Sequence, residues 1–478
     1  MIRKHFTEQT AIFFSVSKWI FLSSVIGVVI GAAVTFFLKI IQYAENHQND
    51  ISYHYFHYYF LLPFMLVLTV WIVKKFAPTA EGHGTEKVIE AVHKNNGKID
   101  IAVIPVKLFA TVITIFAGGS VGKEGPGAQI GAGVSSLVSD IFKFNKSDRK
   151  KLVICGISAG FASVFGTPIA GAIFGVEVLI IGVIMYDVLL PSFIAGFAAF
   201  TTTQFLGIEY TYFDVRFYQD VSLDIPLILE VIAAGIFFGF VSDILVTTLT
   251  GTSALIKKIP YNVYVKAFGG GVLIVILALV FGERYLGLGM DTIKEALNPT
   301  TYLPNSFPWY TFLLKTLFTS ITLGVGGSGG IITPVFYIGA TSGNLFGHLI
   351  GTDHIALFAA LGFVSVLSGS TNAPIAATIM AGELFGIEVT HYAAISAIIS
   401  FLITGHRSVF SSQRLAMKKS EILSLNDGED IESIKVDLGD KEKKKIRNIQ
   451  EILHHKREKL HFEKSHGRRK IECKNEKE

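Results

Sequence analysis

The sequence contains little charge and almost no cysteine. Asp, Glu, Lys and Arg make up only 17% of its 478 residues, whereas 50% are hydrophobic and the mean hydropathy is +0.50. This composition is typical of a polytopic membrane protein, whose surroundings are a lipid bilayer. The two cysteines, Cys155 and Cys473, give neither a disulfide framework nor a metal-ligand spacing. We therefore expect no metal, no cofactor and no nucleic-acid partner.

The motifs of two enzyme classes are also missing. A P-loop NTPase needs G-x-x-x-x-G-K-[ST], but Gly122-Lys123 is followed by Glu124, which removes the magnesium ligand. A membrane metalloprotease needs H-E-x-x-H, and the sequence has no such spacing. We therefore expect that the protein is not an enzyme. A carrier for an organic anion stays open as an alternative, because no motif separates it from a channel.

Long apolar runs and the distribution of charge predict the organisation of the chain. The segment from Arg414 holds 18 basic and 14 acidic residues, whereas the remainder has 24 of each. Basic residues beside the last apolar run favour a cytosolic C-terminus. The first run is too long for a signal peptide and indicates a membrane helix that starts from a cytosolic N-terminus. The expected parts are a cytoplasmic segment (1–18), a first membrane half (19–206), a connection (207–226), a second membrane half (227–413) and a charged cytoplasmic tail (414–478).

Three stretches of the first half recur in the second half in the same order. Residues 107–132 align without a gap with residues 315–340, and 12 of the 26 positions are identical. The stretch that begins at Gly82 recurs from Gly287, and the Pro-Ile-Ala at Pro168 recurs at Pro374. A Glu stands nine residues after the Pro in each of these two Pro-Ile-Ala stretches, at Glu177 and at Glu383. Three ordered matches indicate an internal duplication.

The glycine-rich turn from Gly118 to Pro126 ends one apolar run and opens the next. Burying the charged residues Lys123 and Glu124 between two apolar membrane segments costs free energy, so we interpret them as functional. Glycines let backbone N–H groups approach a ligand, and Pro126 suits the first turn of a helix. A buried helix N-terminus offers unpaired N–H donors and the positive end of the dipole. Since the turn recurs at Gly326–Pro334, we expect an anion site where two broken helices meet.

These motifs resemble the CLC chloride channel and transporter family over about residues 19–413. Gly122–Pro126 matches the family motif G-K/R-E-G-P, and Gly329–Pro334 is similar to its G-x-F-x-P motif, with Ile332 where Phe is usual. The resemblance implies an all-α membrane protein with two inverted, pseudo-symmetric halves of tilted and broken helices. It also implies a multi-pass protein of the cell membrane, a homodimer, an anion path in each subunit and, in some members, voltage gating.

The resemblance assigns the gate to Glu124. When deprotonated, its carboxylate would occupy the anion site itself, and when protonated it would leave that site to a halide. The backbone near Gly330, Ile331 and Ile332 would hold the central anion, since uncharged donors bind weakly enough for release. The other residues expected to contribute are Gly84, Gly122, Gly125 and Lys123, the last of which either adds positive potential or only forms a structural ion pair.

Two positions depart from the family pattern. His83 stands where the family's G-S-G-I-P motif has the Ser that contacts the central anion. A His either donates to the anion and titrates near neutral pH, or points aside and leaves the contact to N–H groups. Phe410 stands where the family has an inner Tyr. Because Phe has no O–H, it would form a weaker inner anion site or a steric gate only.

A third position concerns proton coupling. Many antiporters of the family carry a proton-transfer Glu directly after the residue equivalent to Glu177, but Val178 stands there, as in the family's channels. Because Glu177 and Glu383 are a repeated pair, matching structural roles are favoured for them, with proton transfer by Glu177 as the alternative. The sequence thus predicts channel-like movement of chloride and similar small anions, with a chloride/proton antiporter as the alternative.

Overall fold

The computed structural model describes residues 2–54, 57–210, 225–298, 308–420, 423–424, 431 and 437–438. Within these ranges the chain forms sixteen α-helices, so the predicted all-α architecture is confirmed. The first eight are α1 (Ile2–His54), α2 (Leu62–Phe76), α3 (Thr85–Lys94), α4 (Val103–Phe116), α5 (Glu124–Ile141), α6 (Lys146–Phe165), α7 (Pro168–Glu177) and α8 (Tyr186–Phe205). The second eight are α9 (Ile225–Lys258), α10 (Val263–Phe281), α11 (Met290–Leu297), α12 (Thr311–Gly324), α13 (Ile332–Ile350), α14 (Ile355–Thr371), α15 (Pro374–Phe385) and α16 (Ile387–Thr404).

Strands are minor elements of the structure. β1 (Ile180–Ile181) pairs in parallel with β2 (Arg414–Leu415), and β3 (Leu423–Ser424) pairs with β4 (Asp437–Leu438) in antiparallel fashion. The first pair ties the chain that follows the last helix to the end of α7. Short 3₁₀ turns at Tyr58–Leu61, Pro78–Ala80 and Glu283–Tyr285 complete the described elements.

Six helical stretches are long and apolar enough to cross a membrane. They are Thr7–Gln48, Tyr58–Phe76, Tyr186–Phe205, Ile225–Lys258, Val263–Phe281 and Ile387–Thr404. Several helices between them have only 10 to 17 residues, too few for a full crossing. These include α4, α7, α12, α14 and α15, and glycine turns or prolines bound them in matching positions of the two halves. The arrangement of long outer helices around broken inner ones is that of a polytopic membrane protein.

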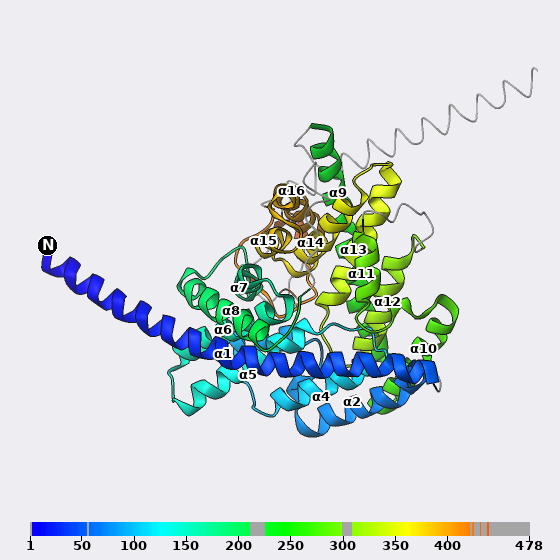
Figure 1. Cartoon of the computed structure of the whole chain (residues 1–478), viewed down its shortest axis with the longest axis horizontal. Coiled ribbons are helices and arrows are strands. Elements are labelled where there is room, and N and C mark those ends of the chain that lie inside the picture. Colours follow the sequence, from blue (N-terminus) through cyan, green and yellow to red (C-terminus); the bar gives the residue numbers. More distant parts are fainter. Residues whose placement is uncertain are drawn as a thin grey trace, which may run out of the picture.

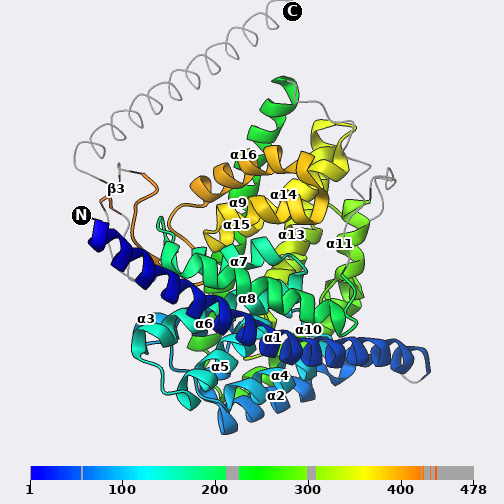
Figure 2. The same ribbon diagram turned by 60° about the vertical axis from the view of Figure 1, so that its left-hand side comes forward.

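The two halves repeat each other's packing. In the first half α5 packs on α6 and α6 on α7, and in the second half α13 packs on α14 and α14 on α15. Helix α1 lies across α4, α5, α6 and α8 along one edge of the molecule (Figures 1 and 2), and α9 packs on α12, α14 and α16. α1 is a single helix of 53 residues, which includes nearly all of the predicted N-terminal segment 1–18.

Reciprocal hydrogen bonds show that the duplicated halves face each other. The N–H of Gly122 donates to the Gly330 carbonyl at 2.6 Å, and the N–H of Gly330 donates to the Gly122 carbonyl at 2.5 Å. The exchange recurs two residues earlier, where a Ser N–H of each half donates to a Thr hydroxyl of the other: Ser120 to Thr322 and Ser328 to Thr114, both at 3.2 Å. The predicted inverted, pseudo-symmetric halves are thus confirmed.

A buried lysine fixes the loop before the short helix of each half. Lys107 and Lys315 are both fully buried. The Lys107 ammonium donates to the carbonyls of Ala80 (3.2 Å) and Gly82 (2.5 Å). Lys315 makes the equivalent bonds with the Tyr285 and Gly287 carbonyls, at 3.1 and 2.8 Å. These lysines therefore hold backbone in place, since buried polar groups need such partners.

The repeated glutamates, Glu177 and Glu383, cap each other's helices. The two carboxylate oxygens of Glu177 accept from the N–H groups of Ile375 and Ala376 at 3.0 and 2.8 Å. Those of Glu383 accept from Ile169 and Ala170 at 3.0 and 2.7 Å. Each carboxylate thus satisfies two unpaired N–H groups at the N-terminus of the opposite half's helix, where negative charge is stabilising.

The cross-capping predicts a stability effect. Replacing Glu383 by Gln leaves one acceptor for two N–H donors, and we expect it to destabilise the fold by about 1–3 kcal/mol. The apparent melting temperature of the purified protein in detergent measures the loss. Glu388→Gln is the matched control, since Glu388 lies in the first turn of the neighbouring α16. Equal melting temperatures for both variants would contradict the capping role.

Candidate functional site

Three helix N-termini converge in the interior of the protein. Helices α3, α5 and α13 begin at Thr85, Glu124 and Ile332, each directly after a glycine-containing turn. The approach is so close that a Cβ on Gly125 would lie 2.1 Å from the His83 carbonyl oxygen and 3.2 Å from the Cα of Gly330. Only glycine fits such a contact. The positive ends of three helices therefore share one buried place, which favours an anion there.

The Glu124 carboxylate lies at this meeting point. The side chain is only 3% exposed. One oxygen accepts from the Thr333 N–H at 3.0 Å, and the Thr333 hydroxyl donates to the carboxylate at 2.6 Å. Thr333 belongs to the first turn of α13, so the carboxylate caps the helix of the other half. Glu124 thus occupies the position in which the N-terminus of α13 would bind an anion.

The backbone donors predicted for the anion fall into two groups. The N–H groups of Gly122 and Gly330 are bonded to each other's carbonyls and serve to join the two turns. Ile331 and Ile332 are buried, and their N–H groups donate to no other described residue, as is usual at the start of a helix. The N–H groups of Ile331 and Ile332 are therefore the ones that an anion can engage, together with that of Thr333.

His83 and Phe410 lie together on another side of the convergence. The His83 ring centroid is 5.9 Å from that of the fully buried Phe410. The His83 Nε2 lies 3.4 Å from the Oε2 of Glu86, and the Ser411 hydroxyl donates to the other oxygen of the same carboxylate. The His83 Nδ1 is buried and has no hydrogen-bond partner within the described ranges. His83 thus has one nitrogen oriented by a carboxylate and one available to a ligand. Gly84, at a φ of +84°, turns the chain between His83 and α3.

Lys123 lies on a water-accessible side of the site. It lines a cavity of about 710 Å³, together with Glu45, Glu209, Arg284 and Asp291 among other residues. The cavity therefore reaches the residue next to Glu124. Its mixed charges make it a polar cavity that water can fill. Glu177, in contrast, does not face the convergence, because both of its carboxylate oxygens bond the N-terminus of α15.

Thr333 was not predicted from the sequence. In the aligned repeats it stands opposite Gly125, three residues after the Gly330 that pairs with Gly122. A hydroxyl in a turn that otherwise holds glycines and isoleucines is the available signal. Glu86 and Ser411, which bond each other beside His83, were missed for a different reason: their positions in the sequence are far apart, and Ser411 lies outside the repeated stretches.

A family model decides the identity of the fold. The model of the voltage-gated chloride channels matches residues 64–405, which is well over half of the chain. The chain belongs to this CLC family. It is a multi-pass membrane protein of a family that transports anions.

Two curated relatives are similar along nearly their whole length. A protein of Pseudomonas syringae pv. tomato named "Chloride/fluoride channel protein" is 33% identical over 422 residues, which cover 86% of this chain and 90% of the relative. An uncharacterized protein of Methanocaldococcus jannaschii is 28% identical over 404 residues, covering 83% and 96%.

Solved structures of the family share the fold. A CLC-type fluoride/proton antiporter is 30% identical with a TM-score of 0.77, and the match covers 84% of this chain and 99% of that one. A slow cyanobacterial Cl⁻/H⁺ antiporter is 19% identical with a TM-score of 0.69, covering 81% and 94%. The second likeness shows the fold alone.

The contact between Glu124 and Thr333 predicts an effect on anion flux. If the carboxylate and an anion compete for the N-terminus of α13, the Thr333 hydroxyl favours the carboxylate. Replacing Thr333 by Val removes this hydrogen bond, which is worth about 1 kcal/mol. We therefore expect anion flux from vesicles at neutral pH to rise by about fivefold.

Thr341→Val is the matched control for this experiment. Thr341 lies further along α13, and its hydroxyl donates to the Tyr337 carbonyl of the same helix at 2.7 Å. The control should keep the anion flux of the unmodified protein. An equal rise in both variants would mean that the Thr333 hydroxyl does not hold the Glu124 carboxylate in place.

Proposed function

We propose that the protein exchanges a small halide for protons across the membrane, with Glu124 as both gate and proton carrier. The observation that carries this proposal is the position of the Glu124 carboxylate on the N-terminus of α13. Like Glu177 and Glu383, Glu124 reaches across from one half to the other, but its partner is the first turn of α13 at the convergence of the three helix N-termini. It thus stands in for the transported anion.

The exchange follows from competition for one set of donors. A charged Glu124 carboxylate holds the Thr333 N–H and hydroxyl and blocks the path. On protonation the carboxyl loses its attraction to the positive helix end. A halide then takes the N–H groups of Thr333, Ile331 and Ile332, while the neutral side chain moves away. When the proton leaves Glu124 toward one side of the membrane and the anion leaves the site toward the other, the two move in opposite directions and are exchanged.

Proton-coupled exchange is favoured over the channel-like movement expected from Val178 and Phe410. The 30% identical solved structure is described as a fluoride/proton antiporter, although the similar curated relative is named a channel. Phe410 has no group that can carry a proton. Beside it, however, lie two residues that can, His83 and Glu86. This pair supports a second protonation step on that side of the site.

Fluoride and chloride are the two candidate substrates. The name of the curated relative includes both ions, and that of the solved structure includes fluoride. The proposed donors are buried N–H groups without a fixed positive charge, which suits a small monovalent anion that must also be released. An organic anion would need more room than three adjacent N–H groups of a closed turn provide.

The direct test is coupled flux in sealed vesicles. A fluoride or chloride gradient, with no other driving force, should move protons uphill in a fixed ratio to the anion. Glu124→Ala should abolish proton movement and leave anion flux intact or raised, because the residue no longer competes for the site. Glu283→Gln is the control and should retain coupling. Glu283 lines the same cavity of about 710 Å³ as Lys123. Anion flux that relaxes to its Nernst potential without proton movement would show a channel.

His83 gives a second test of the site. Since Glu86 lies beside Nε2, the ring offers a donor at Nδ1 only when it is charged. His83→Ser replaces the titratable imidazole by a hydroxyl, which can still donate a hydrogen bond but does not titrate. We expect the variant to transport as well as the unmodified protein near neutral pH and to lose the rise in anion affinity at lower pH. A retained rise would show that His83 points aside.

We also propose a homodimer with both termini in the cytoplasm. Helices α7, α8, α15 and α16 expose apolar side chains, for which a second copy is a suitable neighbour: Ile169, Leu190, Phe197, Ile375, Ile398 and Leu402. The basic residues at the ends of α2 and α9 support the orientation, since Lys and Arg concentrate on the cytoplasmic side. Cross-linking in mild detergent that yields only monomer would contradict the dimer.

A further inference from the structure

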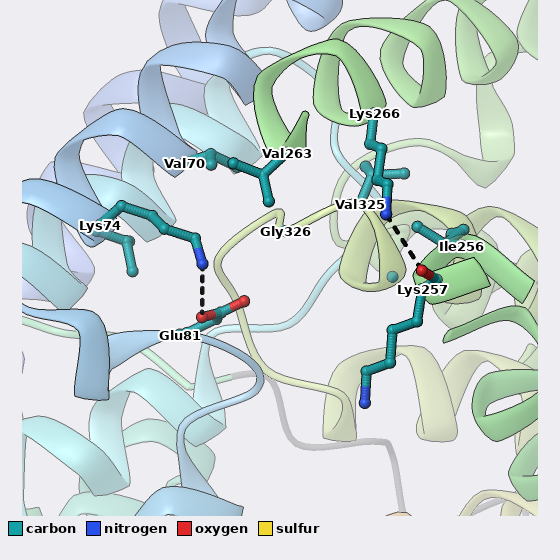
Figure 3. Close-up of a pocket in the computed structure, with 11 residues that line it drawn as sticks. Val70, Lys74, Glu81, Ile256, Lys257, Val263, Lys266, Val325 and Gly326 are labelled. Atoms are coloured by element: carbon teal, nitrogen blue, oxygen red, sulfur yellow. Dashed lines mark hydrogen bonds and ion pairs between the residues drawn. The ribbon is translucent and has the colours of Figure 1, made fainter. Parts of the chain in front are cut away.

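A second cavity lies away from the anion site, between the ends of four helices. Its volume is about 140 Å³, well above the roughly 10–15 Å³ that one water needs. The lining comes from the last turns of α2 and α9, the first turn of α10 and the chain that leaves α12. Figure 3 shows Lys74 and Glu81 on one side of Gly326, with Lys257 and Lys266 on the other.

The charge of this cavity is positive. Three lysines and one acid, Glu81, line it. Glu81 lies 3.7 Å from the Lys74 ammonium and neutralises part of that charge. The Lys266 ammonium donates to the Lys257 carbonyl at 3.5 Å, which positions it but leaves its charge uncompensated. The exposed Lys257 forms no ion pair with any other described residue. The cavity therefore carries a surplus of two positive charges.

The wall of the same cavity is apolar. Val70, Val73, Ile256, Val263 and Val325 line it between the lysines. The helices that carry the lysines are membrane-span candidates, and they expose further apolar side chains next to the cavity: Leu68, Trp71, Leu255, Ile259, Val265 and Phe268. Basic groups thus stand at the ends of spans, directly beside surfaces that lipid chains cover.

We propose that this pocket binds the phosphate of an anionic phospholipid, with the acyl chains along α2 and α10. Basic pockets between membrane helices at the cytoplasmic level are suited to anionic headgroups. A free anion would use the lysines but not the apolar wall, whereas a phospholipid uses both. This inference is independent of the proposed antiport.

The position of the pocket connects the headgroup with the anion site. Gly324 and Gly326 lead directly into the turn that holds Gly330, and Glu81 precedes His83 in the loop that Lys107 fixes. A phosphate on Lys74, Lys257 and Lys266 would therefore join the ends of α2, α9 and α10 beside two of the three turns that converge on Glu124. The headgroup also competes with Glu81 for Lys74.

The helix ends provide a matched control. Lysines near the last turn of a helix also stabilise its carbonyl groups, and Lys75 and Lys258 stand at the same ends of α2 and α9. Neither lines the pocket, and Lys75 instead lies over the rings of Trp71 and Phe76. The pairs Lys257→Gln/Lys266→Gln and Lys75→Gln/Lys258→Gln remove equal charge from inside and outside the pocket.

The test compares lipid retention and melting temperature for the full chain. The purified protein is placed in nanodiscs of phosphatidylcholine alone or of phosphatidylcholine and phosphatidylglycerol in equal parts. We expect phosphatidylglycerol to raise the melting temperature and to stay bound after detergent extraction, as counted by mass spectrometry. The pocket pair should lose most of the rise and of the retained lipid, and the control pair should keep both.

Three results would overturn the proposal. Equal losses in both pairs would show general attraction of anionic lipid to a basic surface. Full retention in the pocket pair would place the lipid elsewhere. A rise in melting temperature with inorganic phosphate, lost in the pocket pair, would show that the site takes a free anion instead of a lipid. Because each variant is compared with itself in the two lipid mixtures, a loss of basal stability does not affect the result.

Discussion

The structure depends on one backbone contact, the pair of hydrogen bonds between Gly122 and Gly330. The contact holds the N-termini of α5 and α13 head to head in the interior, each with about half a positive charge at its end. Two such ends repel each other unless negative charge lies between them. The Glu124 carboxylate provides that charge, and in the proposed exchange an anion provides it when the carboxylate is protonated. In this proposal transport arises from a constraint that the fold itself imposes.

The two halves are nearly symmetric where they support the fold and differ where they carry function. Buried lysines, Ser–Thr bonds and capping glutamates all occur in reciprocal pairs. At the centre the pairs break: Glu124 stands opposite Ile332, and Gly125 opposite Thr333. One half thus supplies a carboxylate and the other supplies its donors. If both halves carried a glutamate at this position, two negative charges would lie at one site and repel each other.

The sequence predicted the features that repetition and apolar patterning encode. The duplication indicated that Gly122 and Gly330 are equivalent, and the structure brings them into contact. Glu124 was singled out because a charge in an apolar run is rare. The repeated spacing of Glu177 and Glu383 favoured matching structural roles, and the structure shows each as a cap of the other half's helix.

Other contacts of the site have no such sequence signal. The Thr333 hydroxyl meets Glu124 only because two turns pair through their backbones, which one-dimensional patterns do not express. The environment of His83 depends on Glu86 and on the distant Ser411 and Phe410. The division of N–H groups between the bridge and the anion also needed coordinates, because it follows from the register of the two turns.

The most direct measurement is proton uptake during halide binding to the purified protein in weakly buffered detergent solution. If the anion and the charged Glu124 carboxylate compete for the same donors, binding of fluoride or chloride must release the carboxylate to take up a proton. We therefore expect the solution to become more alkaline in step with halide binding, and Glu124→Gln to bind halide without this change. Halide binding to the unmodified protein with no proton uptake, at a pH where the gate is charged, would contradict it.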